Sequence, residues 1–114
     1  MQRAPIAVPV EVRAGRLRVY RLSQDIGEDG ISLEQAAPFD EGRPVEIRFV
    51  LPMLDETVPI TLRAQLQAGS HAAVDEDGRP IETFGGSELA FIEASANQIE
   101  DVKRYVKGRL TRPV

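Results

Sequence analysis

The chain has 114 residues, 42% of them hydrophobic and 28% charged, which is typical of one small globular domain and too short for two ordinary ones. It contains no cysteine, so a disulfide scaffold, a thiolate metal site and a cysteine nucleophile are excluded. The net charge of −4 is segregated along the chain: five arginines face one acid in residues 1–22, 17 acids face four arginines in residues 23–101, and residues 102–114 carry five bases. This pattern fits either a solvated surface whose basic ends attract the acidic middle, or an anion- or partner-binding face built from the ends.

The N-terminus lacks the apolar core and small-residue cleavage site of a signal peptide. No stretch approaches the roughly 20 apolar residues that a membrane helix needs. We therefore expect a cytoplasmic protein that is not inserted in a membrane.

Alternating apolar and polar residues predict half-buried β-strands along most of the chain. The first two stretches, on either side of Ala14-Gly15, read as a hairpin. Proline residues at 52 and 59 are expected at or just outside strand ends. The residues expected on the buried face of the strands are Val8, Val10, Val12, Leu17, Val19, Val45, Ile47, Phe49, Leu51, Ile60, Leu62, Ala64, Leu66, Leu89 and Phe91.

After residue 92 the period changes to that of a helix. Ser95 and Gln98 match a capping box, in which each side chain bonds the other residue's backbone N–H. Apolar residues then follow at helical spacing up to Gly108, which is expected to end the helix. The predicted fold is mainly β: a single domain over residues 1–114, with a small six-stranded antiparallel barrel over about 8–93 and a C-terminal α-helix over about 96–108. Residues 67–84 are expected to form a long exposed hairpin loop.

The stretch Asp25-Ile-Gly-Glu-Asp-Gly30 resembles the Asp-x-Ser-x-x-Gly signature of the PilZ family of bacterial signalling barrels. Pro38-Phe-Asp-Glu-Gly42 before a long strand, and a short last strand followed by a capped helix, are similar to later parts of that family. The resemblance covers roughly residues 3–110. It implies a barrel with a C-terminal helix and a site for cyclic di-GMP, formed by two arginines spaced Arg-x-x-x-Arg and by the signature turn.

This sequence departs from both halves of that site. The serine position of the signature is Gly27, and upstream of Asp25 no arginine has a second arginine four positions later. Arg3 alone remains if it is aligned with the first arginine, and both arginines are lost if the pair falls on Gln2 and Ile6. The candidate residues of a vestigial cyclic di-GMP site are thus Arg3, Asp25, Gly27 and Gly30. A simpler interpretation is an acidic turn in which Gly27 and Gly30 supply positive φ angles.

Four further arginines remain as possible substitutes for the lost pair: Arg13, Arg16, Arg18 and Arg21. If they converge near Asp25, the protein is a working cyclic di-GMP receptor. If they do not, it is a degenerate PilZ-like module of the cyclic di-GMP network, without a cofactor. Such a module would act as an adaptor or regulator that binds a signalling or motility protein, with control of motility, pili or polarity as its setting. The oligomeric state is then a monomer or weak homodimer, and the binding patch is expected on the C-terminal helix or the acidic segment 67–84.

Catalysis has little support, because the chain has one histidine, His71, and no nucleophile motif. Nucleic-acid binding is disfavoured because the strands are net acidic and aromatic residues make up only 5% of the chain.

Overall fold

The computed structural model describes residues 2–67 and 86–110. They form seven β-strands and one α-helix: β1 (Arg3–Pro5), β2 (Pro9–Ala14), β3 (Leu17–Gly27), β4 (Gly30–Leu33), β5 (Pro44–Pro52), β6 (Thr57–Gln67), β7 (Glu88–Glu93) and α1 (Ala96–Leu110). The predicted loop over residues 67–84 lies almost wholly outside the described residues.

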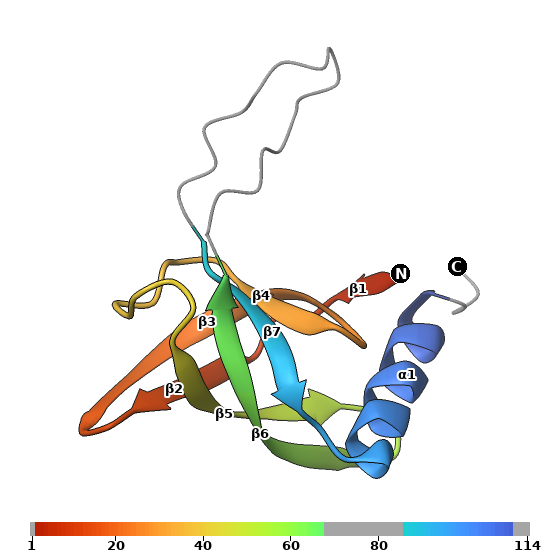
Figure 1. The fold of residues 1–114 in the computed structure, drawn as a ribbon. Coiled ribbons are helices and arrows are strands. Elements are labelled where there is room, and N and C mark those ends of the chain that lie inside the picture. The colour runs from red at the N-terminus through yellow and green to blue at the C-terminus, as the bar shows by residue number, and fades with distance from the viewer. Residues whose placement is uncertain (1, 68–85, 111–114) are drawn as a thin grey trace.

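Six of the strands close into an antiparallel barrel, as predicted (Figure 1). Going round the barrel, the order is β3, β2, β5, β6, β7 and β4, and β4 pairs with β3 to complete the circle. The long strand β3 pairs with three other strands. Its first half pairs with β2, and its second half pairs with β4 on one edge and with the additional strand β1 on the other.

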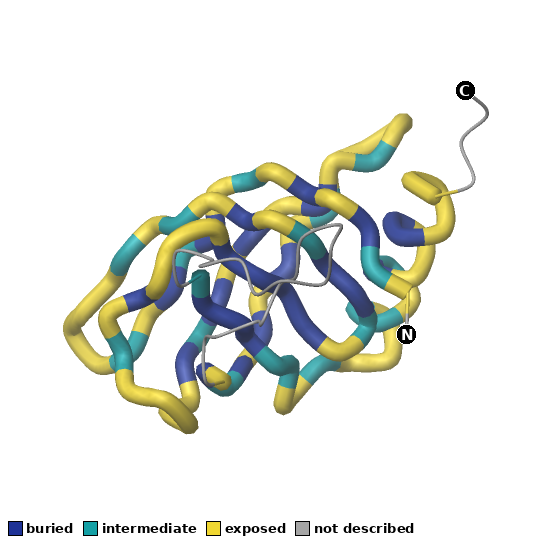
Figure 2. The backbone as a smooth tube through the Cα atoms, turned by 90° about the horizontal axis from the view of Figure 1, so that it is seen from above, coloured by how far each residue is buried: buried dark blue, intermediate teal, exposed yellow. Residues whose placement is uncertain are grey.

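The alternating pattern fills the barrel with aliphatic side chains, and Figure 2 shows buried and exposed positions alternating along the tube. The residues expected on the buried face of β5 and β6 are all buried, as are Val10, Val12 and Leu89. Val8, Val19 and Phe91 are partly buried against this core. Leu17 differs from the prediction: it lies beside the hairpin turn at Gly15 and remains 47% exposed.

Helix α1 begins with the predicted capping box. The Ser95 N–H donates to Gln98 Oε1 at 2.9 Å, and the Gln98 N–H donates to Ser95 Oγ at 3.1 Å. The helix buries Val102, Tyr105 and Val106, and the Tyr105 hydroxyl donates to the Pro5 carbonyl of β1 at 2.7 Å. It continues two residues past Gly108, so the prediction that this glycine ends it is wrong. No helix in the described part of the chain is long and apolar enough to cross a membrane.

Two details of the strands also differ from expectation. Gly27 is the last residue of β3 and Gly30 the first of β4, and neither has a positive φ; among the described glycines, positive φ occurs at Gly15 and Gly42. Pro59 lies within β6 rather than at its end. It is tolerated there because β6 pairs with β7 only from Arg63 onward, so the proline occupies a stretch with a single partner strand.

Candidate functional site: an arginine held by three carboxylates

Strand β1 brings the N-terminus over the end of β3. Arg3 lies opposite Gly27, and Pro5 lies opposite Asp25. The link from β1 to β2 is held by Ser23, a fully buried residue of β3. Its hydroxyl donates to the Ile6 carbonyl at 2.7 Å and accepts the Val8 N–H at 2.9 Å. These contacts set the position from which Arg3 reaches the barrel.

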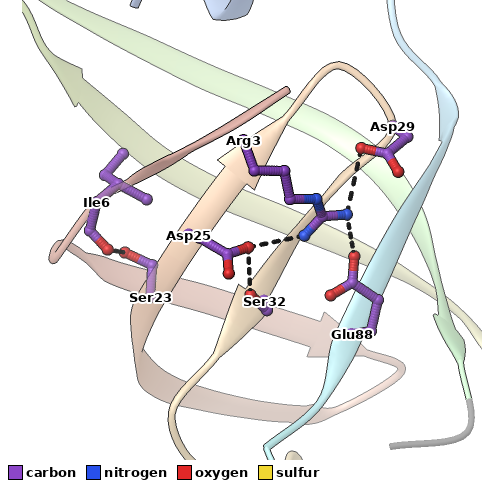
Figure 3. A network of polar contacts seen from close by, with 7 residues as sticks. All are labelled: Arg3, Ile6, Ser23, Asp25, Asp29, Ser32 and Glu88. Carbon is purple, nitrogen blue, oxygen red and sulfur yellow. Dashed lines mark hydrogen bonds and ion pairs between the residues drawn. The ribbon is translucent and has the colours of Figure 1, made fainter. Parts of the chain in front are cut away.

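The Arg3 guanidinium bonds three carboxylates from three parts of the chain (Figure 3). Nη1 lies 2.8 Å from Asp25 Oδ1, and Nη2 lies 3.2 Å from Asp29 Oδ1. Nη2 also pairs with Glu88 Oε1 at the start of β7. Ser32 of β4 completes the network by donating its hydroxyl to Asp25 Oδ1 at 2.6 Å. We call Arg3, Asp25, Asp29 and Glu88 the arginine cluster.

The three carboxylates of the cluster stabilise the charged form of Arg3. Burial alone would lower the pKa of the Arg3 guanidinium, but its hydrogen bonds to Glu88 and Asp25 outweigh burial and raise the pKa above its ordinary value. Glu88 is only 8% exposed, so its pairing takes place largely out of water. One guanidinium and three carboxylates leave the cluster with a formal charge of −2.

Close approach of neighbouring atoms, rather than turn geometry, explains Gly27 at the serine position of the signature and Gly30 at its glycine position. A Cβ on Gly27 would lie 2.9 Å from Arg3 Cγ, from Asp29 Oδ1 and from the Gln2 carbonyl oxygen. A Cβ on Gly30 would collide with the backbone carbonyl of Leu89 in the paired strand β7. The signature residues Asp25, Gly27 and Gly30 therefore do converge with Arg3, but in an arrangement that leaves no space for a larger side chain at position 27.

The other arginines considered as substitutes lie elsewhere. Arg18 is seven residues before Asp25 on the same strand, a separation of roughly 23 Å. Arg13 pairs with Glu46 of β5 at 3.3 Å, and Arg16 lies in the β2–β3 turn. Arg21 donates to the backbone carbonyls of Ala36 and Tyr20. These side chains do not converge with Arg3 on one pocket.

Sequence reasoning missed three members of the network. Asp29 was visible as part of the acidic turn, but Ser32 and Glu88 carried no distinguishing local signal. Glu88 is 85 residues from Arg3 and reaches it because β4 and β7 pair with Ser32 opposite Glu88. That register is set by barrel closure, which no local pattern encodes.

A second surface feature surrounds the C-terminal half of α1. Two adjoining hollows of about 250 and about 360 Å³ share Pro52, Tyr105 and Arg109 as lining residues. Leu54, on the turn between β5 and β6, lines the first hollow and is 82% exposed. Among the described residues no side-chain group bonds or pairs with Arg109, whereas Arg104 is paired with Glu56 and Asp101.

No group of acidic or histidine side chains within residues 2–67 and 86–110 is arranged to hold a metal ion. In the arginine cluster, the three carboxylates face a guanidinium instead.

No protein-family model matches the chain, and no curated protein matches it significantly. Solved structures do match. The inhibitor of motility MotI/DgrA of Bacillus subtilis superposes with a TM-score of 0.74 at 19% identity over 97% of this chain, which spans about half (51%) of that protein. The PilZ domain of YcgR from Escherichia coli, a structure with c-di-GMP, gives 0.68 at 17% identity over 95% of this chain and 88% of that one. The PilZ domain of CeSA from a cellulose-synthesizing bacterium gives 0.61 at 19% identity over 95% of this chain and 97% of that one. With its six-stranded barrel, its N-terminal strand over the end of β3 and its C-terminal helix, this chain has the fold of a PilZ domain.

Proposed function

We propose that this PilZ-like domain does not bind cyclic di-GMP and acts in the cyclic di-GMP network as a protein-binding adaptor or regulator. The observation that carries the proposal is the arginine cluster. The one arginine available at the signature turn is already bound to three carboxylates of the same chain.

Charge disfavours the nucleotide at this position. Cyclic di-GMP carries two phosphate anions, and the arginine cluster has a formal charge of −2. A guanidinium that is bonded to Asp25 and Glu88 has few donors left for a phosphate or a guanine edge. Breaking those pairs to release it would remove the Arg3 guanidinium from the largely buried Glu88 carboxylate, which is costly.

The lack of space beside the signature turn also disfavours binding of the nucleotide. The nucleotide-binding signature has a serine where this chain has Gly27, and a Cβ there meets Arg3, Asp29 and the backbone of Gln2. The space next to the signature turn is filled by the chain's own N-terminal segment. A receptor would use the serine hydroxyl and a free arginine here. In this chain the hydroxyl is absent at Gly27, and Arg3 is bonded to carboxylates of the same chain.

The surface around α1 supports a protein-binding role. Arg109, which pairs with no side chain among the described residues, lines both hollows beside Tyr105, and the exposed Leu54 lines the first of them. Tyrosine and arginine, which line both hollows as Tyr105 and Arg109, are enriched among the residues that dominate protein interfaces. A partner segment with an apolar side chain and a nearby carboxylate fits this combination. The other patch considered from the sequence, residues 67–84, lies outside the described residues except for Gln67.

The proposed setting is control of motility, pili or polarity. One structural neighbour is named as an inhibitor of motility, and another is a PilZ domain determined with c-di-GMP. Both are similar in fold to this chain. The network and the kind of partner are carried over from them as part of the proposal.

Isothermal titration calorimetry with cyclic di-GMP tests the first half of the proposal. With the YcgR PilZ domain as positive control in the same moderate-salt buffer, we expect no saturable heat from this protein up to about 100 μM ligand. Saturable binding in the low micromolar range would refute the proposal and make the protein a receptor. Alanine substitutions at Arg3, Arg13, Arg16, Arg18 and Arg21 would then locate the arginines involved.

Capture of bacterial proteins on the immobilised domain tests the second half. We expect R109E and L54D to abolish retention of a partner that the wild-type domain retains. The matched control is R16E, a charge reversal at an exposed turn position away from α1. Equal capture by R109E, L54D and R16E would show that α1 is not the docking surface.

A further inference from the structure

On the outer face of the barrel, charged and apolar side chains are arranged in separate rows. Strands β3, β2, β5 and β6 lie side by side, and their outward residues fall into rows across the strands. One row is charged and contains Arg18, Arg13, Glu46 and Arg63. The next is mixed and contains Tyr20, Glu11, Arg48 and Thr61. The third is apolar and contains Leu22, Pro9, Val50 and Pro59.

The apolar row borders a hollow and is open to solvent. Leu22 is 42% exposed, Val50 is 41% exposed, and Tyr20 of the mixed row is 59% exposed. A hollow of about 530 Å³ is lined by Pro9, Val50 and Pro59 together with Tyr20 and neighbouring residues. The outward face of a half-buried sheet is normally polar, so a contiguous apolar row beside a hollow marks an interaction surface.

We propose that this face binds a second copy of the same chain, in an isologous dimer whose two-fold axis runs parallel to the strands between β2 and β5. Such an axis lays β2 of one copy over β5 of the other and keeps each row over itself. The apolar row then meets the apolar row, with Pro9 over Val50. In the mixed row, Tyr20 of each copy lies over Thr61 of the other, beside the hollow.

Charge complementarity selects this partner and this axis. Within a row the signs on β2 and β5 are opposite: Glu11 is aligned with Arg48, and Arg13 is aligned with Glu46. The proposed axis therefore sets Glu11 over the other copy's Arg48 and Arg13 over the other copy's Glu46. An axis perpendicular to the strands would instead set Glu11 over Glu11 and the apolar row over the charged row.

One pair opposes the arrangement, because Arg18 would face Arg63 of the other copy. These residues lie on β3 and β6, which curve away from the axis on either side of β2 and β5. Both guanidinium groups are exposed at that edge and can turn to solvent, and Arg63 is 3.9 Å from Glu93. The unfavourable pair is therefore at the rim, while the favourable pairs flank the axis.

Sedimentation equilibrium of the full chain, from about 5 to about 500 μM, tests the proposal. We expect a reversible monomer–dimer equilibrium for the wild type and at least a tenfold weaker one for E11R and for R48E, because the symmetry doubles each change. The double variant E11R/R48E restores the opposite signs across the axis and should associate within about threefold of wild type. V50D should be monomeric throughout, with a far-UV circular dichroism spectrum like that of wild type.

The matched control is I92D, which puts the same new charge on a β7 residue that is 46% exposed and belongs to none of the three rows, and it should dimerise like wild type. A wild-type protein that stays monomeric over the whole range would overturn the proposal. So would a double variant that associates no better than either single one, or loss of the dimer in I92D with its retention in V50D. Because cyclic di-GMP titration and partner capture use other residues, these results are independent of the proposed function.

Discussion

Ser23 shows how one small side chain positions the N-terminal strand. It is completely buried, and its hydroxyl satisfies two backbone groups of the segment that joins β1 to β2. Those groups, the Ile6 carbonyl and the Val8 N–H, belong to the short segment that joins β1, which carries Arg3, to β2. The residue lies outside the family-like signature, yet the placement of Arg3 depends on it.

We expect S23A to destabilise the protein by about 2 kcal/mol, because removing the hydroxyl leaves a buried donor and a buried acceptor without partners. Urea unfolding followed by circular dichroism measures the change in the free energy of unfolding. The control is T57A, which removes a hydroxyl from an exposed strand residue and should change stability by less than about 0.5 kcal/mol. Equal effects of the two substitutions would contradict the role given to Ser23.

At Gly27, restoring the serine of the signature should harm the protein rather than create a nucleotide site. The new Cβ must displace Arg3, Asp29 or the Gln2 backbone, at a cost of about 1–3 kcal/mol. We therefore expect G27S to melt at a lower temperature than wild type and to remain silent in titration with cyclic di-GMP. Unchanged stability together with nucleotide binding would show that the N-terminal segment moves aside easily.

At the scale of elements, helix α1 depends on a correct start and on a few buried contacts. Its capping box closes the first turn, and Gln98 Nε2 also donates to the Thr61 carbonyl of β6 at 2.7 Å. One side chain thus caps the helix and ties it to the barrel. The Tyr105 hydroxyl makes a second tie, to β1.

Removing the serine of the capping box tests this account. We expect S95A to cost about 1 kcal/mol, the usual value for an N-cap hydroxyl. The Gln98 N–H is solvent-accessible enough to find water once the hydroxyl is gone, so the loss should not exceed a normal cap. Thermal unfolding reports the change, and S95D serves as control because aspartate is an equally good N-cap. A loss in S95D equal to that in S95A would mean that the cap is unimportant.

The sequence predicted the elements in which apolar residues recur at the regular spacing of a strand or a helix. Strands β5 and β6 alternate over nine and eleven residues, and α1 carries both a cap and a helical period. Strand β1 was missed because three residues, Arg-Ala-Pro, are too few to show a period. Likewise Arg3 and Asp25 could be nominated from motif spacing, whereas Glu88 could not, since only the β4–β7 register brings it to them.

In the whole molecule, the two basic ends of the chain are joined to its acidic middle. Arg3 binds Asp25, Asp29 and Glu88; Arg13 binds Glu46; Arg104 binds Glu56. Lys103 lies 3.4 Å from Glu28, and this hydrogen bond raises its pKa. Of the two interpretations of the charge pattern, these contacts match the one in which the ends attract the middle.

These ion pairs should differ in their sensitivity to salt. We expect R104Q to cost about 0.5 kcal/mol or less at low ionic strength and nothing near 1 M NaCl, because both partners are exposed. R3Q should cost about 2 kcal/mol and retain most of that cost in high salt, because Glu88 is largely shielded from water. Parallel urea titrations of both variants and of wild type at the two salt concentrations give the comparison. Equal salt dependence would mean that the arginine cluster is as well solvated as the surface pairs.

The closure of the barrel between β4 and β7 also determines when the chain can fold during synthesis. Ile31 finds its partner Leu89 only after 58 further residues have been made. Until β7 leaves the ribosome, β4 and the paired end of β6 each present an unsatisfied strand edge, and Arg3 lacks the carboxylate of Glu88. The β2–β3 and β5–β6 hairpins can form early, but the nascent chain remains open to wrong strand pairing until β7, the last strand among the described residues, has emerged.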